Sequence, residues 1–262
     1  MKNILLFAII IITATTVRSQ NAWETVNIEL SDPGKIGTLE LHIHRGMITV
    51  IGENRSDVEL SFKRQGDEGR ERSKNGLKRI SGSAVDIDIT EYKNHVDIDA
   101  GNEQTDYTVR VPTNFSLSLA SHHDADIKVQ NVIGELEVQS HHGGIELENV
   151  GGSVLAETHH GGIQVSMVSI DGSKPMAFST YHGDVEVTLP VGINCMTKIN
   201  PGRGEIFTDF DIDIKPTRQE KTTTSDGKRE IKVGGWVQGQ IGSGGKEYMF
   251  TTYHGDVILR KG

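Results

Sequence analysis

Histidines form the pattern in this sequence that is best suited to chemistry. A short phrase recurs along the chain, starting at Ser121, Ser140, Thr158, Thr180 and Thr252, and each copy carries His-His or Tyr-His directly after its first residue. The histidines in these copies are His122, His123, His141, His142, His159, His160, His182 and His254. Neutral imidazole nitrogens are preferred ligands of zinc and copper. The phrase therefore predicts either a metal-binding surface or a structural role shared by all copies.

The spacing of the copies predicts how the imidazoles lie relative to one another. Ile127, Ile145 and Ile163 each follow one copy and are 18 residues apart. A fixed period this short indicates stacked units, in which equivalent residues of neighbouring strands are ~4.8 Å apart. The imidazoles would then form a ladder along one edge.

Two interpretations of this ladder are open. In the first, it binds zinc or copper. The candidate metal ligands are His141, His142, His159, His160 and His182. In the second, which we favour, histidine takes the place of asparagine in tight turns, where it tolerates a left-handed backbone, and the chain binds no cofactor. His42 and His44 lie outside the phrase and are interpreted as ordinary strand residues.

Hydrophobic residues around the phrase recur at every second position, as Ile145 and Leu147 do, and then Val154 and Ala156. This period predicts strands. No window shows the helical period of apolar residues. The sequence therefore predicts an all-β fold, specifically a single-stranded parallel β-solenoid with about 18 residues per coil.

The phrase resembles a known family motif. Thr180–Val185 and Thr252–Val257 match the Ser/Thr-x-x-Gly-Asp-Ile/Val phrase that repeats in the bacterial putative-adhesin domain family of unknown function. Tyr107–Pro112 and Gly239–Gly245 are similar to segments that flank the repeats in that family. The resemblance implies a β-solenoid at the cell envelope. One departure is that His-His or Tyr-His stands where the family usually has small polar residues.

The start of the chain is typical of a secretory signal peptide. Residues 1–19 carry Lys2, an apolar run from Ile4 to Ile12 and a small-residue cleavage site before Gln20. The apolar run is too short for a bilayer, which needs ~20 residues. We therefore expect an exported protein that is periplasmic, exposed on the cell surface or secreted, with no membrane-spanning segment.

One domain is expected after the signal peptide. Residues 20–262 would form a β-solenoid with less regular N-terminal coils at 24–116, regular repeats at 117–190, an inserted hairpin arm at 191–238 and a final coil at 239–262. Within the irregular part, Gly46–Val50 is a degenerate copy of the repeated phrase.

Charge and cysteine content narrow the function further. The net charge of −9 at pH 7 leaves no basic surface for nucleic acid or anionic lipid. Cys195 is the sole cysteine, so no intramolecular disulfide forms. We interpret its side chain as a small buried hydrophobe and not as a nucleophile.

The two outward faces of the predicted strands differ in polarity. Leu155, Ala177 and Met249 make one face apolar and are a possible contact face, covered either by the arm, which we favour, or by a partner. The other face offers Glu146 and Glu186, with no basic residue expected nearby. This argues against the carboxylate pair or calcium cluster that a carbohydrate-active enzyme needs.

The sequence favours a non-catalytic, exported binding or scaffold module of the cell envelope, adhesin-like by resemblance. Its partner would be an envelope protein or a glycan. Two alternatives stay open, namely a transition-metal-binding protein that uses the histidine ladder and a carbohydrate-active parallel β-helix enzyme.

Overall fold

The computed structural model describes residues 23–65, 73–74, 77–78, 87–123, 125–215, 220–225, 228–233 and 235–262. Every regular element in these ranges is a strand, so the prediction of an all-β fold is confirmed. The signal-peptide prediction for residues 1–19 lies outside the described residues. Nothing in the described ranges forms a helix with the length and apolar character that a membrane crossing requires.

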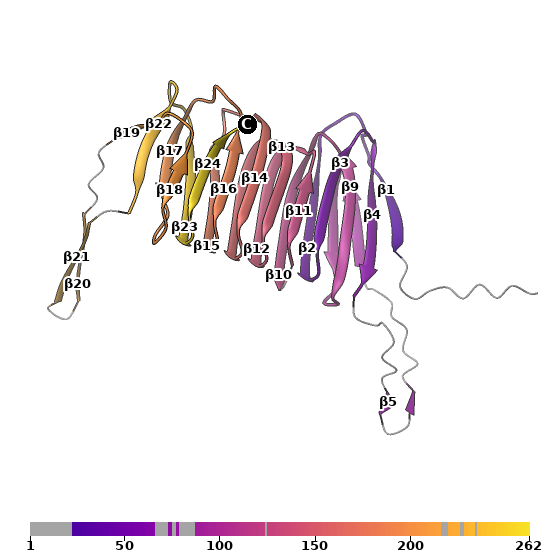
Figure 1. Ribbon diagram of the computed structural model, residues 1–262. Coiled ribbons are helices and arrows are strands. Elements are labelled where there is room, and N and C mark those ends of the chain that lie inside the picture. The colour runs from indigo at the N-terminus through magenta and orange to yellow at the C-terminus, as the bar shows by residue number, and fades with distance from the viewer. Residues whose placement is uncertain are drawn as a thin grey trace, which may run out of the picture.

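The strands stack side by side along one long axis (Figure 1) and their pairings make two rows. The first row contains, in spatial order, β7 (Ile87–Tyr92), β8 (His95–Ala100), β2 (Gly37–Arg45), β10 (Phe115–His123), β12 (Ile133–His142), the second half of β13 (Ile145–His160), β15 (Met176–His182), β23 (Glu247–His254), β17 (Cys195–Asn200), β22 (Val237–Ile241) and β19 (Asp213–Lys215). Pairing is parallel from β8 to β17 and antiparallel at both ends of this row.

The second row lies against the first. It contains β1 (Glu24–Glu29), β4 (Asp57–Arg64), β9 (Thr105–Pro112), β3 (Ile48–Glu53), β11 (Ile127–Gln130), the first half of β13, β14 (Ile163–Ile170), β16 (Val185–Leu189), β24 (Val257–Lys261) and β18 (Ile206–Thr208). Two hairpins, β5 (Ser73–Lys74) with β6 (Leu77–Lys78) and β20 (Glu220–Ser225) with β21 (Lys228–Val233), form separate two-stranded sheets.

Columns of branched apolar side chains fill the space between the rows. The hydrogen-bonded register aligns one such column in the order Ile127, Ile145, Ile163, Val185 and Val257, all of them buried. Inward residues of both rows belong to one continuous core. The offset between paired residues is 18 from Ile127 to Ile163 but 22 from Ile163 to Val185. Burial of these alternating positions is what selects the register, because a one-residue slip would turn every apolar side chain outward.

The order of the strands in space departs from their order in the chain. We call one strand of the first row and its successor in the second row a coil. The coil β23/β24 lies between β15/β16 and β17/β18, and the coil β2/β3 lies between β8/β9 and β10/β11.

Residues 191–238, expected to form an inserted arm, begin instead with a coil of the stack. Cys195, Thr197 and Ile199 of β17 alternate inward and are buried, so this strand can pair with β23 as any repeat strand does. β18 pairs with β24 in the same way, and β22 then covers the outer edge of β17.

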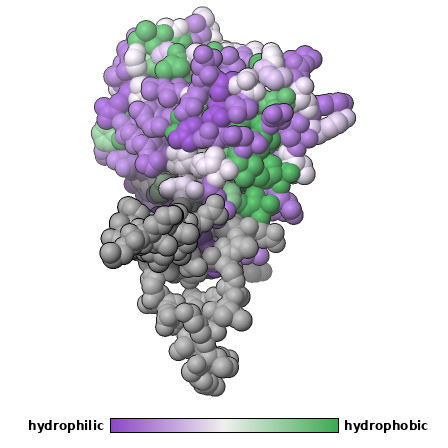
Figure 2. Space-filling model, turned by 90° about the vertical axis from the view of Figure 1, so that its right-hand side faces the viewer, coloured by the Kyte–Doolittle hydropathy of each residue, from purple (hydrophilic) through white to green (hydrophobic). Residues whose placement is uncertain are grey.

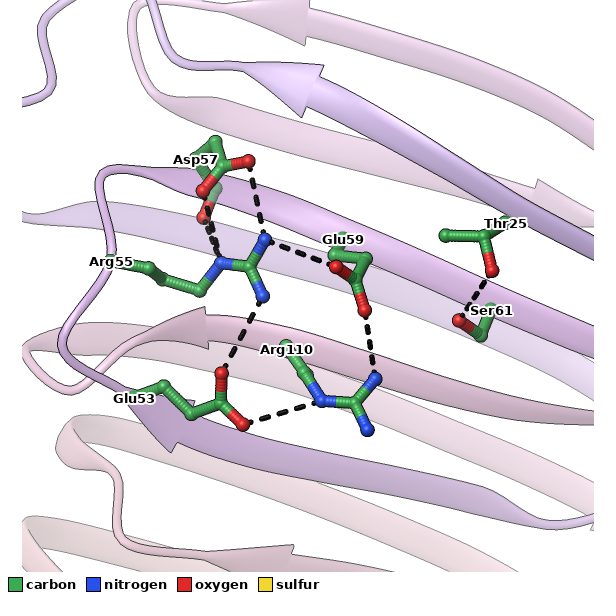
Figure 3. Close-up of polar contacts among 7 residues, drawn as sticks. All are labelled: Thr25, Glu53, Arg55, Asp57, Glu59, Ser61 and Arg110. Carbon is green, nitrogen blue, oxygen red and sulfur yellow. Dashed lines mark hydrogen bonds and ion pairs between the residues drawn. The ribbon is translucent and has the colours of Figure 1, made fainter.

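A network of ion pairs ties the antiparallel strands at the N-terminal end (Figure 3). The side chain of Arg55, only 14% exposed, reaches Glu53, Asp57 and Glu59, with Nε 3.0 Å from Asp57 Oδ1. Arg110 on β9 bonds Glu59 on β4 at 2.8 Å and also contacts Glu53. Two guanidinium groups thus form ion pairs with three carboxylates and link β3, β4 and β9. The surface of this end of the stack is mainly hydrophilic, with a few hydrophobic patches (Figure 2).

Candidate functional site: a ladder of stacked rings

Two columns of stacked rings run along one edge of the stack, and we call them together the ring ladder. The first column consists of His44, His122, His141, His159, Tyr181 and Tyr253. Successive centroids are 4.8–5.5 Å apart and the planes are inclined by 7–20°. The second column consists of His123, His142, His160, His182 and His254, with centroids 4.8–5.8 Å apart. Because the faces are used in stacking, the ring edges remain to meet a partner.

Within each coil the two rings meet edge to face. Nδ1 of His141 lies 2.8 Å from Nδ1 of His142, and the corresponding distance from His122 to His123 is 3.3 Å. Such a contact needs one nitrogen to donate its hydrogen and the other to accept it. A doubly protonated pair would set two N–H groups against each other, so the geometry suits a neutral or singly charged pair.

Buried hydroxyl groups hold the strand end under each pair of rings. Thr158, Thr180 and Thr252 each donate a 2.8 Å hydrogen bond to a glycine carbonyl in the turn of the neighbouring coil. Ser121 and Ser140 both donate to the carbonyl of Ala125. These bonds explain the Ser or Thr that begins every copy of the phrase, because an unpaired buried carbonyl costs ~1–3 kcal/mol.

The turn after the rings requires glycine for a steric reason. Gly161 and Gly183 have φ angles of 143° and 128°, and a Cβ on Gly161 would lie 2.4 Å from the carbonyl oxygen of Gly143. The amide of Gly161 donates to the carbonyl of His182, and that of Gly183 to the carbonyl of His254, both at 2.8 Å. The rings therefore stand on turns that are hydrogen bonded from coil to coil.

Stacking also changes the acidity of the imidazoles. For His141 and His160, loss of water around the stacked ring holds the pKa below its usual value, and the positive charge of neighbouring imidazoles adds to this. The same causes lower the pKa of His123, with Arg45 contributing. At the other end, desolvation and then Arg203 lower the pKa of His254.

The ladder contains all five residues proposed from sequence as metal ligands: His141, His142, His159, His160 and His182. Two nitrogens that share a zinc ion at ~2.0–2.1 Å are at most about 4.2 Å apart. Each coil carries at most two imidazoles and so offers at most two such ligands to one ion. No group of three or more His, Cys, Asp or Glu that could hold a metal ion occurs among the described residues.

Sequence reasoning missed the ends of the ladder. His44, interpreted as an ordinary strand residue, stacks on His122 at 5.5 Å. The degenerate copy at Gly46–Val50 carried the signal, because it places the preceding strand beside a repeat strand. In that register Ile43 pairs with Ser121 and Arg45 with His123, so His44 falls at the His122 position. At the opposite end, the guanidinium carbon of Arg203 lies 5.2 Å from the ring centroid of Tyr253 and covers its face.

The expected contact face is aligned but not covered. Leu155 pairs with Ala177 and Ala177 with Met249, so the three side chains form one outward column. The side chain of Leu155 is 47% exposed, so the expectation that the arm covers this face is wrong at that position. The reason is that β17 and β18, which begin the expected arm, are strands of the stack itself.

The carboxylates considered for catalysis have basic neighbours, contrary to expectation. Lys128 Nζ lies 2.7 Å from Glu146, and Arg260 Nε lies 2.5 Å from Glu186. Both cations come from an adjacent coil, which is a relation that the sequence order hides. Cys195 is buried as expected, and burial raises the pKa of its thiol to about 11.

Comparison with known proteins gives weak similarities. No family model matches the chain, and no curated protein matches it. A crystal structure of a "putative cell adhesion protein" from Clostridium sporogenes aligns with 92% of this chain and 100% of its own at a TM-score of 0.49 and 11% identity. A "putative adhesin" from Bacteroides fragilis aligns with 92% and 97% at a TM-score of 0.25 and 8% identity. Neither similarity is strong enough to assign this chain to a family.

Proposed function

We propose that this chain is a parallel β-solenoid that acts as a non-catalytic, exported binding or scaffold module of the cell envelope, adhesin-like by resemblance. The observation that carries this proposal is the ring ladder. It sets hydrogen-bonding ring edges at regular intervals on turns that are bonded from coil to coil. A long, evenly spaced and exposed row suits recognition of an extended partner better than that of a compact substrate.

The engagement of both carboxylates considered for catalysis supports a non-catalytic role. General acid and base catalysis needs carboxyl groups with access to a substrate proton. Glu146 and Glu186 are instead each engaged by a cation. The thiol of Cys195 is fully buried, and its raised pKa keeps it protonated at neutral pH.

Transition-metal capture is the second candidate, because each of two coils brings a pair of Nδ1 atoms within 3.3 Å. Calorimetry with zinc or copper tests it. The test variant replaces His141, His142, His159 and His160 with Asn, which suits the turn but is a poor ligand for these metals. Stoichiometric binding at micromolar affinity that is lost in this variant would put metal capture first.

Fractionation and binding to envelopes test the main proposal. The tagged chain, produced in its source organism, should leave the cytoplasm, and the purified chain should bind the envelope fraction of that organism. Replacement of His122, His141 and His159 by Asn removes the centre of the first column and should weaken binding at least tenfold. Retention in the cytoplasm, or envelope binding no stronger than that of an unrelated acidic protein, would overturn the proposal.

A further inference from the structure

Beside the ring ladder, a second ladder joins carboxylates to backbone amides. At the position directly before a strand of the second row, an aspartate accepts a hydrogen bond from the amide of the equivalent residue in the next coil. The bonds run from Gly144 N–H to Asp126 Oδ1 at 2.8 Å, from Asp256 N–H to Asp184 Oδ1 at 2.8 Å and from Glu205 N–H to Asp256 Oδ1 at 2.9 Å. The amide of Met47 is bound by Asp106 Oδ1 at 3.0 Å in the N-terminal coils. A carboxylate oxygen thus accepts from the amide at this position in four coils.

The carboxylate ladder is interrupted at Met47, whose side chain has no oxygen, and in two adjacent coils at Gly144 and Gly162. The two glycines have no side chain to offer, and within the described chain the amides of Gly162 and Asp184 have no hydrogen-bond partner. The backbone does not demand glycine at either place. An added Cβ on Gly144 would come no closer than 3.5 Å to another atom. One on Gly162 would lie 3.3 Å from the carbonyl oxygen of Asp184, a tight contact that a shift of a few tenths of an ångström relieves. Two adjacent amide donors are therefore left open where an acidic side chain would fit.

The interruption lies in a groove of about 460 Å³ on the second row of strands. Its polar lining consists of Asp126, Lys128, Glu146, Gln164, Asp184 and Glu186. Ile127, Ile145 and Ile163 also line it, and their side chains belong to the buried core. This volume is within the ~300–1,000 Å³ range of small-molecule sites.

The polarity of the groove selects the chemistry of a ligand. The two open amides need an oxygen acceptor, whereas the carboxylates and Gln164 around them accept hydrogen bonds. A hydroxyl group meets both demands, because it accepts one hydrogen bond and donates another. A carboxylate or sulfate would meet the first demand alone and would be repelled by the acidic lining.

We propose that this groove binds a neutral, hydroxyl-rich carbohydrate chain that runs along the stack. Ligand oxygens would take the place that aspartate carboxylates occupy in the neighbouring coils, on the amides of Gly162 and Asp184, while ligand hydroxyls donate to Asp126 and Asp184. Equivalent amides of neighbouring coils are ~4.8 Å apart, so adjacent hydroxyls or adjacent sugars can reach both. This inference rests on the proposed binding function and names its ligand class.

The variants that test it complete the carboxylate ladder. Gly144→Asp supplies the missing acceptor for Gly162 N–H, and Gly162→Asp supplies that for Asp184 N–H. The matched control is Gly172→Asp, which adds the same charge as each single substitution, at a place where a new Cβ meets nothing within 4 Å. Thermal unfolding establishes that all variants are folded, and an aspartate at each position has a native precedent at Asp184 and Asp256.

Binding is measured on immobilised oligosaccharides of glucose, galactose, mannose, N-acetylglucosamine and galacturonate, with a lysine-rich peptide beside them. We expect the wild type and Gly172→Asp to bind at least one neutral oligosaccharide, and Gly144→Asp/Gly162→Asp to bind it at least tenfold more weakly. Titration should move the amide resonances of Gly162 and Asp184. Three results would overturn the assignment of a neutral carbohydrate to this groove. They are binding confined to galacturonate or to the peptide, no binding at all, or equal binding by the wild type and by Gly144→Asp/Gly162→Asp, the filled variant.

Envelope binding separates this inference from the proposed function. If the wild type binds envelopes and the filled variant binds them equally well, the function stands and the groove is not its site. If the wild type binds no envelope, the proposed function itself fails.

Discussion

At the scale of single residues, the turn glycines explain why the phrase tolerates so little change. Gly183 has a φ of 128°, and an added Cβ would lie 2.6 Å from the carbonyl group of Gly161. Side chains other than glycine are rarely found in this region of backbone space. Two independent penalties, strain and overlap with a neighbouring backbone, thus act at one position.

We predict that Gly183→Ala lowers the free energy of unfolding by about 1–3 kcal/mol or more, the usual cost of one strained residue. Chemical denaturation followed by circular dichroism measures it. Gly172→Ala is the matched control, because its Cβ would meet nothing within 4 Å and its φ lies outside the left-handed region. Equal stability of the two variants would show that neither strain nor overlap acts at Gly183.

Residue types in the phrase could be predicted in part from sequence. The need for glycine and the row of imidazoles followed from spacing alone. The hydroxyl bond from Thr180 to the carbonyl of Gly161 did not, because it joins two coils whose contact requires the register. The open amides of Gly162 and Asp184 were hidden for the same reason. The carboxylate that would accept from each amide is missing from the preceding coil. Comparison of the copies shows the two glycines at that position, but it does not show which backbone amides they leave without a partner.

At the scale of elements, the ring ladder makes stability depend on pH. The pKa values of His123, His141, His160 and His254 are lowered by desolvation and by neighbouring cationic groups, including Arg45 and Arg203. The unfolded chain therefore takes up protons before the folded chain does. The contribution of these groups is complete above the unfolded pKa of ~6.5 and declines as the pH falls through that value.

We predict that the melting temperature is highest above about pH 7 and falls between pH 7 and pH 5. Replacement of His141 and His160 by Asn should flatten this part of the profile, and differential scanning calorimetry measures both. His42→Asn, outside the ladder, is the control and should keep the wild-type slope. A melting temperature that rises on acidification would show that the imidazoles are stabilised in their charged form.

The order of the strands in space could not be predicted from the sequence. The copies at Thr180 and Thr252 predict that their coils are equivalent, but equivalent turns fit together in any order. In the structure, Ala177 pairs with Met249, and Met249 in turn pairs with Lys198. The last coil in the chain is thus the penultimate coil in space.

Cross-linking tests this order. In a Cys195→Ala background, the pair Ala177→Cys and Met249→Cys should form a disulfide, because paired parallel strands place Cα atoms ~4.8 Å apart, within the range for disulfides of ~4.4–6.8 Å. The pair Ala177→Cys and Lys198→Cys spans two strand spacings and should stay reduced. Mass spectrometry after mild oxidation shows whether each of the two cysteine pairs has formed a disulfide. The reverse result would mean that the coils stack in simple sequence order.

At the scale of the whole molecule, the general architecture was accessible from sequence and the ends were not. Alternation and repeat spacing predicted an all-β chain with aligned apolar columns. The antiparallel pairing of β1, β4, β22 and β19, which closes the two rows, was not predicted, because these strands carry no copy of the phrase. The final coil at 239–262 does not end the stack, since β24 is paired on both sides, by β16 and β18.

Exposed strand edges invite association with another copy, and the true edges of the stack are β1 and β7 at one end and β18 and β19 at the other. β18 and β19 are three residues long, which is too short to template a long ladder. β1 begins and ends with glutamate, and charge on an edge strand opposes pairing. The net charge of −9 adds repulsion between copies.

We therefore predict a monomer without filaments at neutral pH. Light scattering coupled to size exclusion should give the monomer mass, and negative-stain microscopy should show no fibres. Replacing Glu24 and Glu29 with Thr removes the charges from the β1 edge while keeping its β-propensity, and should raise self-association if edge charge is the barrier. Replacing the outward Glu146 and Glu186 with Gln removes equal charge away from the edge and is the control. Filaments of the wild type would show that the ends of the stack are built to join, and would favour a polymer-forming scaffold.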